Sequence, residues 1–168
     1  MSWIKPALCV VLIVGLPLGC SAVGRSINAS YMIGYVPEKF GLTHDYSEGA
    51  CIAGLSGYMG AFAVGLDTET VRQIETEGIH YFDDIGGPRS RGLRVHFGDW
   101  KETPAPETAF SPEPSGYYHC GQRHDPSWPS GMREALRRPG SFYSDNLQGR
   151  SAVVIPSLGI IAVSMETR

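Results

Sequence analysis

Apolar side chains recur along this chain with two different periods, one typical of strands and one typical of helices. Leu93, Val95 and Phe97 alternate with polar side chains at the positions between them. A period of two residues puts these three side chains on one face of an extended segment. Residues 92–98 are therefore predicted to form a half-buried strand.

The clearest helical pattern covers Thr68–Glu77. Asp67 precedes it, and an aspartate carboxylate can accept hydrogen bonds from the free N–H groups of a first helical turn. Val71 and Ile74 begin an apolar stripe at helical spacing. Gly78 stands where a left-handed residue commonly ends a helix, so a helix from 68 to 77 is predicted.

A second, shorter helix is predicted over Trp128–Arg138. Met132, Ala135 and Leu136 share one helical face at spacings of three and four residues. Pro139-Gly140 ends the pattern, and the arginines just before it favour the negative end of the helix dipole.

Short runs of apolar residues predict the other strands. Ala152–Ile155 and Ile160–Met165 form a hairpin about Pro156–Gly159, and their nearly continuous apolarity predicts a central place in the sheet. The remaining predicted strands are residues 31–36, two short strands within 50–66 joined near Ser56-Gly57, and residues 79–85. Loops are predicted at 37–49 and 101–116. The fold class is therefore α+β, with one antiparallel or mixed sheet of about six or seven strands and two short helices.

The chain begins with an apolar segment that differs from the rest. One basic residue, Lys5, precedes residues 6–19, which carry no charge. A helix needs about 20 apolar residues to span a bilayer core. This run of 14 residues suits the apolar region of a signal peptide better than a permanent span, so residues 1–19 are predicted to be an export signal.

Leu18-Gly19-Cys20 resembles the processing site of exported bacterial lipoproteins, although Pro17 stands where that family usually has leucine or another non-proline residue. The resemblance covers the signal region alone. It implies cleavage before Cys20, lipidation of its thiol and attachment to a membrane on the periplasmic side of the cell envelope. Cys20-Ser21-Ala22 also fits an ordinary signal peptidase, which leaves a soluble periplasmic or secreted protein as the alternative.

Removal of residues 1–19 leaves 149 of the 168 residues, enough for one domain with a buried core. Residues 20–30 are small and polar and are predicted to be a tether, and residues 31–168 a single globular domain. The formal net charge of the full chain is -3. Its 14 basic residues are scattered, which argues against a nucleic-acid partner.

Two of the four cysteines, Cys51 and Cys120, lie in the predicted mature domain. A cysteine pair in an oxidising compartment most simply forms a disulfide. Closure of a loop of about 70 residues stabilises a fold by roughly 4 kcal/mol in the chain-entropy model. We therefore expect a disulfide between Cys51 and Cys120, and this expectation depends on export.

Two groups of residues have the chemistry of metal ligands. His119 and His124, together with Cys120, offer the imidazole and thiolate groups that zinc prefers, but a structural zinc site needs four ligands and the thiol has a use in the disulfide. Asp83-Asp84 could bind a hard cation, yet the spacing of a calcium loop is missing around it. A solvated end of the strand predicted at 79–85 is the simpler interpretation of the two aspartates.

A hydrolase could use Cys51 as its nucleophile or His44 as its base, but no spacing in the sequence selects a catalytic partner for either. No nucleotide-binding glycine motif occurs. The sequence therefore favours an exported envelope protein that binds another macromolecule, most simply a protein, without enzymatic activity, cofactor or metal. A small envelope hydrolase and a zinc-binding module at His119 and His124 are the alternatives.

Overall fold

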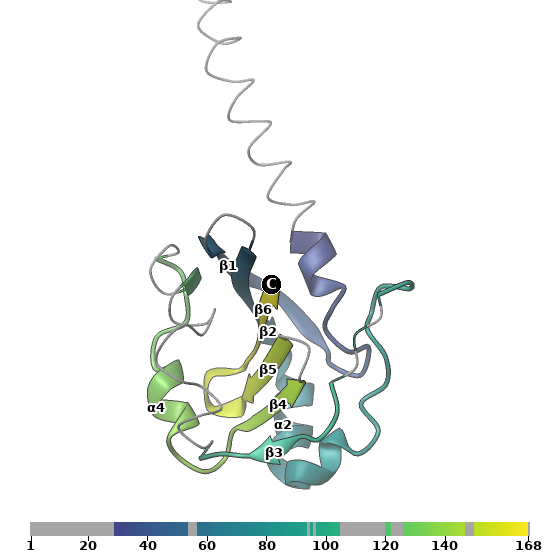
Figure 1. The fold of residues 1–168 in the computed structure, drawn as a ribbon. Coiled ribbons are helices and arrows are strands. Elements are labelled where there is room, and N and C mark those ends of the chain that lie inside the picture. Colours follow the sequence, from purple (N-terminus) through teal and green to yellow (C-terminus); the bar gives the residue numbers. More distant parts are fainter. Residues whose placement is uncertain are drawn as a thin grey trace, which may run out of the picture.

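A computed structural model of the chain describes residues 29–53, 57–93, 95, 97–104, 120–121, 126–146 and 150–167. Within these ranges the side chains of 50–53, 57–59, 145–146 and 166–167 lie outside the description. The described part forms one open antiparallel sheet of six strands with a few short helices (Figure 1). This architecture confirms the predicted α+β class.

The strands lie in the order β1-β2-β6-β5-β4-β3, and each pairs with its neighbours in the antiparallel sense. Their bounds are Leu42–Ala53 for β1, Gly57–Leu66 for β2, Lys101–Glu102 for β3, Phe142–Asn146 for β4, Arg150–Ile155 for β5 and Ile160–Thr167 for β6. The strand β3 is only two residues long and forms one edge.

The hairpin of β5 and β6 confirms the prediction for the C-terminal part of the chain. Its connection is a short 3-10 helix, η3 (Pro156–Leu158), followed by Gly159 with a φ of 61°. Glycine adopts this left-handed conformation without the steric penalty of a side chain. Ile155 then pairs with Ile160, and both strands lie in the middle of the sheet, as their apolarity predicts.

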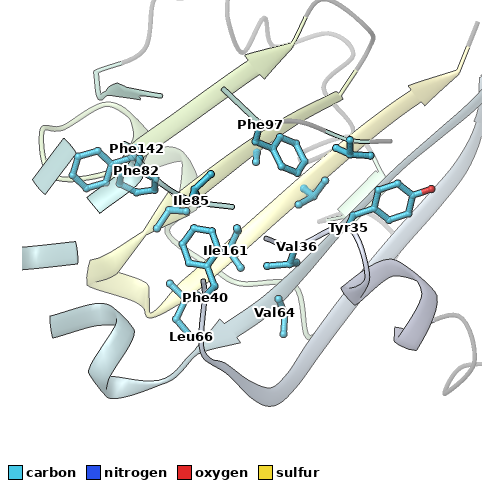
Figure 2. Packing of buried hydrophobic residues seen from close by; sticks show 14 of the residues in the cluster. Tyr35, Val36, Phe40, Val64, Leu66, Phe82, Ile85, Phe97, Phe142 and Ile161 are labelled. Carbon is cyan, nitrogen blue, oxygen red and sulfur yellow. The ribbon is translucent and has the colours of Figure 1, made fainter. Parts of the chain in front are cut away.

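One face of the sheet carries large apolar side chains, which pack against the segments 32–40 and 74–97. Alternation along β2 explains this, since Phe62, Val64 and Leu66 are two residues apart and point to the same face. The labelled side chains of this cluster in Figure 2 are at most 7% exposed: Tyr35, Val36, Phe40, Val64, Leu66, Phe82, Ile85, Phe97, Phe142 and Ile161.

The opposite face carries smaller side chains and is covered by helix α4 (Met132–Leu136) and the segment before it. Its buried cluster consists of Ala61, Ala63, Tyr143, Val153, Ile155, Ile160 and Ala162 from the strands, with Trp128, Met132 and Leu136 above them. The predicted helix over 128–138 is thus shortened to five residues, and Met132 and Leu136 form its buried side. The sheet is therefore the middle layer of three.

Helix α2 (Thr68–Glu77) has the predicted bounds and both predicted caps. The carboxylate of Asp67 accepts a hydrogen bond from the backbone N–H of Thr70 at 2.7 Å. Gly78 has a φ of 58°, and its N–H donates to the carbonyl oxygen of Ile74. The prediction was correct here because caps are local interactions that depend on a few neighbouring residues.

Two predictions near the start of the domain were wrong. Residues 29–33 are helical, where a strand at 31–36 was expected. Met32, Tyr35 and Val36 are buried at spacings of three and four residues, so the apolar run covers the sheet and does not enter it. The loop expected at 37–49 is also shorter, because β1 begins at Leu42.

The strand predicted at 79–85 is a 3-10 helix, η1 (Gly78–Phe82), followed by a turn. Tyr81 and Phe82 are consecutive and both buried in the same cluster, with their rings in edge contact at 5.4 Å between centroids. A strand would have sent these two side chains to opposite faces. The tight turn that starts at Gly78 instead brings both to one core.

The alternating segment 92–98 buries Val95 and Phe97 as predicted, but the described residues of this segment are not part of a strand. Val95 and Phe97 belong to the cluster of large apolar side chains on the first face of the sheet. The strand β4 was not predicted. The loop predicted at 101–116 begins with the edge strand β3, and residues 105–116 lie outside the description.

Candidate ligand-binding cleft

The turn after η1 and the segment before β3 together enclose a cleft of about 530 Å³, which we call the aspartate cleft. It is lined by Ile79, residues 82–87 and residues 97–100. The two segments are separated by residues 88–96 and meet in the folded chain. A volume of this size is in the range of about 300–1,000 Å³ that small-molecule and side-chain binding sites occupy.

Aromatic rings form one wall of the aspartate cleft. Phe82 and Trp100 are stacked with 4.5 Å between ring centroids and 28° between their planes. The ring of Phe142 in β4 packs on Phe82 from the core side, with 4.8 Å between ring centroids. The indole N–H of Trp100 donates a hydrogen bond to the carbonyl oxygen of Phe97 at 3.2 Å. The wall is therefore anchored in the buried core.

All charged side chains that line the described part of this cleft are carboxylates, namely Asp83, Asp84 and Asp99. All three are exposed. Asp99 has a φ of 51°, a left-handed conformation that a residue other than glycine adopts at a cost. His80 contacts Asp83 at 3.1 Å from outside the cleft. The cleft thus presents negative charge beside aromatic rings.

Contacts with the loop at 37–41 hold the turn that closes the cleft. The backbone N–H of Glu38 donates to the carbonyl oxygen of Gly87 at 3.0 Å, and Pro37 and Pro88 form an isolated antiparallel bridge. The guanidinium of Arg89 donates to the carbonyl oxygen of Phe40. These bonds fix the backbone, so the cleft is formed before any ligand binds.

The aspartates do not form a metal site with the described residues. Within the part of the chain that the structure describes, no three histidine, cysteine, aspartate or glutamate side chains are grouped closely enough to hold a metal ion. Asp83 and Asp84 are solvated, as the simpler interpretation of the sequence had it, but they follow a 3-10 helix and not a strand.

The structure places Cys120, one half of the predicted disulfide, against strand β1 at Gly49. Cys120 is fully buried, and its carbonyl oxygen lies where a side chain on Gly49 would be. Gly49 is two residues before Cys51 in the same strand. The side chain of Cys51 lies outside the described residues, so the disulfide stays a prediction.

The other predicted chemical residues are not brought together in the described structure. His44 is exposed near the start of β1 and does not line the aspartate cleft. His119, His124 and Cys20 lie outside the described residues, as does the whole predicted signal at 1–19.

No protein-family model matches this sequence, and no curated protein and no solved structure matches it either. Among the described residues there is no helix of the length and apolarity needed to cross a membrane.

The sequence did not predict the aspartate cleft. A signal for it was present, because Asp83-Asp84 stands between the apolar residues Phe82 and Ile85. Asp99-Trp100 repeats the combination of a carboxylate and an aromatic ring. Nothing in the local pattern indicates that these two segments meet.

Proposed function

We propose that this chain is an exported, lipid-anchored envelope protein that acts without enzymatic activity by binding another macromolecule, and that the aspartate cleft is its binding site. The single observation that carries the binding part is the cleft itself, which combines three carboxylates with a stacked aromatic wall. That combination suits a cationic group of a protein partner, such as a lysine or arginine side chain.

Two interactions favour a cation in the aspartate cleft. The carboxylates of Asp83, Asp84 and Asp99 attract positive charge at the mouth of the cleft. A cation over the face of an aromatic ring such as Trp100 gains about 0.5–2 kcal/mol, depending on how far it is removed from water. The preformed backbone limits the entropy lost on binding.

The address of the protein rests on the first twenty residues alone. The uncharged run at 6–19 supports export, and the resemblance of Leu18-Gly19-Cys20 to lipoprotein processing sites supports a lipid on Cys20. The acyl chains would hold the domain at the envelope, with residues 21–28 between the anchor and the described fold.

Mass spectrometry of the full chain, expressed with its own N-terminus in its native host, tests both parts. We expect an N-terminal peptide that begins with an acylated Cys20, and one or more envelope proteins that are cross-linked to the wild-type chain. The triple variant D83N/D84N/D99N should lose these partners. An N-terminus at Met1, or partners that the triple variant retains, would contradict the corresponding part of the proposal.

A matched control variant removes the same number of negative charges elsewhere. Glu38, Asp45 and Glu77 are exposed and do not line the aspartate cleft. The variant E38Q/D45N/E77Q should therefore keep the partners that D83N/D84N/D99N loses. Loss of the partners from both variants would show that overall charge, and not the cleft, is responsible.

A further inference from the structure

A second concave surface lies beside the aspartate cleft, between the end of α2, the strand β3, helix α4 and η3. It encloses about 660 Å³, and we call it the glutamate groove. Its charged side chains are Glu75, Glu102, Glu134 and Arg138, so three carboxylates and one guanidinium line it. The net formal charge of this lining is therefore negative, as it is for the aspartate cleft.

The lining of the glutamate groove also includes apolar side chains. Leu158 of η3 is 38% exposed, and among the described residues only Tyr31 is a more exposed large apolar side chain. Ile74 and Phe142 line the groove from the core side. Exposure of a leucine within a concave surface costs solvation free energy, and an apolar group of a partner would recover it.

The two concave surfaces share a wall. Gly78 lines the groove and the next residue, Ile79, lines the cleft. Trp100 of the cleft and Glu102 of the groove are two residues apart, and Lys101 between them lines neither. The rings of Phe82 and Phe142, one from each surface, are 4.8 Å apart between centroids. Figure 1 shows α2 and β3 at the same end of the molecule.

We propose that the aspartate cleft and the glutamate groove form one docking surface for an extended, basic segment of a partner protein that carries an apolar side chain for Leu158. This inference rests on the proposed function, because it extends the same binding site. The charge of the two linings favours a basic occupant. Six carboxylates and one guanidinium line them in total, which repels phosphate groups and attracts lysine and arginine side chains.

An extended segment suits this surface better than a single cation does. Each extended residue advances the chain by about 3.3 Å, so a short peptide can place basic side chains in both concave surfaces at once. Two linked contacts bind more tightly than either alone, because the second contact forms at a high effective concentration.

Fluorescence anisotropy of a labelled peptide, Gly-Lys-Leu-Lys-Ser-Lys-Leu-Lys-Gly, tests this with the full-length protein. We expect saturable binding that weakens as salt is added, since the contacts are largely electrostatic. Replacement of every lysine in the peptide by glutamate should abolish binding. Equal binding of the glutamate peptide would overturn both this inference and the choice of the aspartate cleft as a site for cations.

Variants then separate the inference from the proposed function. E75Q/E102Q/E134Q should weaken binding of the lysine peptide by about fivefold or more, and D83N/D84N/D99N should weaken it by a similar factor. Leu158→Ser should weaken binding of the same peptide. It should not change binding of a peptide whose leucines are replaced by serine. The control E38Q/D45N/E77Q should stay within about twofold of wild type.

The outcomes are distinguishable. If the glutamate variant and Leu158→Ser both bind like wild type while the aspartate variant does not, the extended surface is wrong and the proposed function stands. If the aspartate variant binds like wild type, the binding site assigned under the proposed function is wrong. Circular dichroism of each variant checks that the fold is retained.

Discussion

The ring of Phe82 stacks on the indole of Trp100, with 4.5 Å between their centroids. Phe82 ends η1 and is 5% exposed, whereas Trp100 lies just before the edge strand β3 and is partly exposed. Both rings line the aspartate cleft, and the ring of Phe82 is also part of the buried core. The pair joins two segments that the chain order separates, and so creates the wall of the cleft.

Replacement of Trp100 tests the role of this pair. Trp100→Leu should lower the free energy of unfolding by about 1–3 kcal/mol, because a stacked and partly buried ring is lost. It should also weaken binding of the lysine peptide. Trp128 packs on the opposite face of the sheet. Trp128→Phe should therefore lower stability without weakening binding of the peptide. Urea denaturation and peptide titration of both variants check this, and equal peptide binding by the two variants would contradict it.

Gly49 allows the close approach of Cys120 to β1. A side-chain carbon at position 49 would overlap the carbonyl oxygen of Cys120. Gly49→Ala should therefore lower the free energy of unfolding by about 1–3 kcal/mol, the usual cost of overpacking. Gly87 is the matched control, since a side-chain carbon there meets nothing within 4 Å. Thermal unfolding should show a lower midpoint for Gly49→Ala and little change for Gly87→Ala.

The predicted disulfide between Cys51 and Cys120 can be measured directly. Mass spectrometry of peptides digested without reductant should recover the two cysteines in one linked pair. Cys120→Ser should then lower the free energy of unfolding by roughly 4 kcal/mol in the chain-entropy model for a loop of about 70 residues. Recovery of both cysteines as free thiols from protein exported by its host would contradict the pairing.

The burial of the Tyr81 hydroxyl predicts that the protein loses stability at alkaline pH. Burial raises the pKa of its hydroxyl above the usual 10.0, and the hydroxyl donates to the carbonyl oxygen of Lys39 at 3.3 Å. The folded state therefore holds this proton more tightly than the unfolded chain does. The resulting stabilisation is fully present below about pH 10 and is lost as the pH rises through the folded-state pKa.

Denaturation of Tyr81→Phe at several pH values checks this. The variant should be less stable than wild type near pH 8, because a hydrogen bond is lost, and should show a smaller decrease in stability above about pH 10. An equal alkaline decrease in the wild type and in Tyr81→Phe would assign it to other groups.

Elements with local signals could be predicted from the sequence. Asp67 and Gly78 bound α2, and Gly159 permits the tight connection of β5 and β6. In each case the interactions that define the element lie within a few residues of one another, so the pattern of residues contains them.

Elements that depend on distant contacts were predicted wrongly or not at all. The run at 31–36 has the composition of a strand, but it is helix and turn because the sheet offers a surface for Met32 and Val36. Phe142–Asn146 gives a weak local signal and becomes β4 because β5 and β3 pair with it. Pairing between strands is set by partners elsewhere in the chain, which local propensity does not contain.

The sequence by itself determined the fold class, the capped helix at 68–77 and the central C-terminal hairpin, because hydrophobic period and cap residues act over short distances. Only the tertiary structure decided that Asp83-Asp84 and Asp99 face one cleft. The stacking of Phe82 on Trp100 brings those segments together. The physical reason is that burial of aromatic surface does not depend on how far apart two rings are in the chain. The shape of the folded core decides which rings pack together.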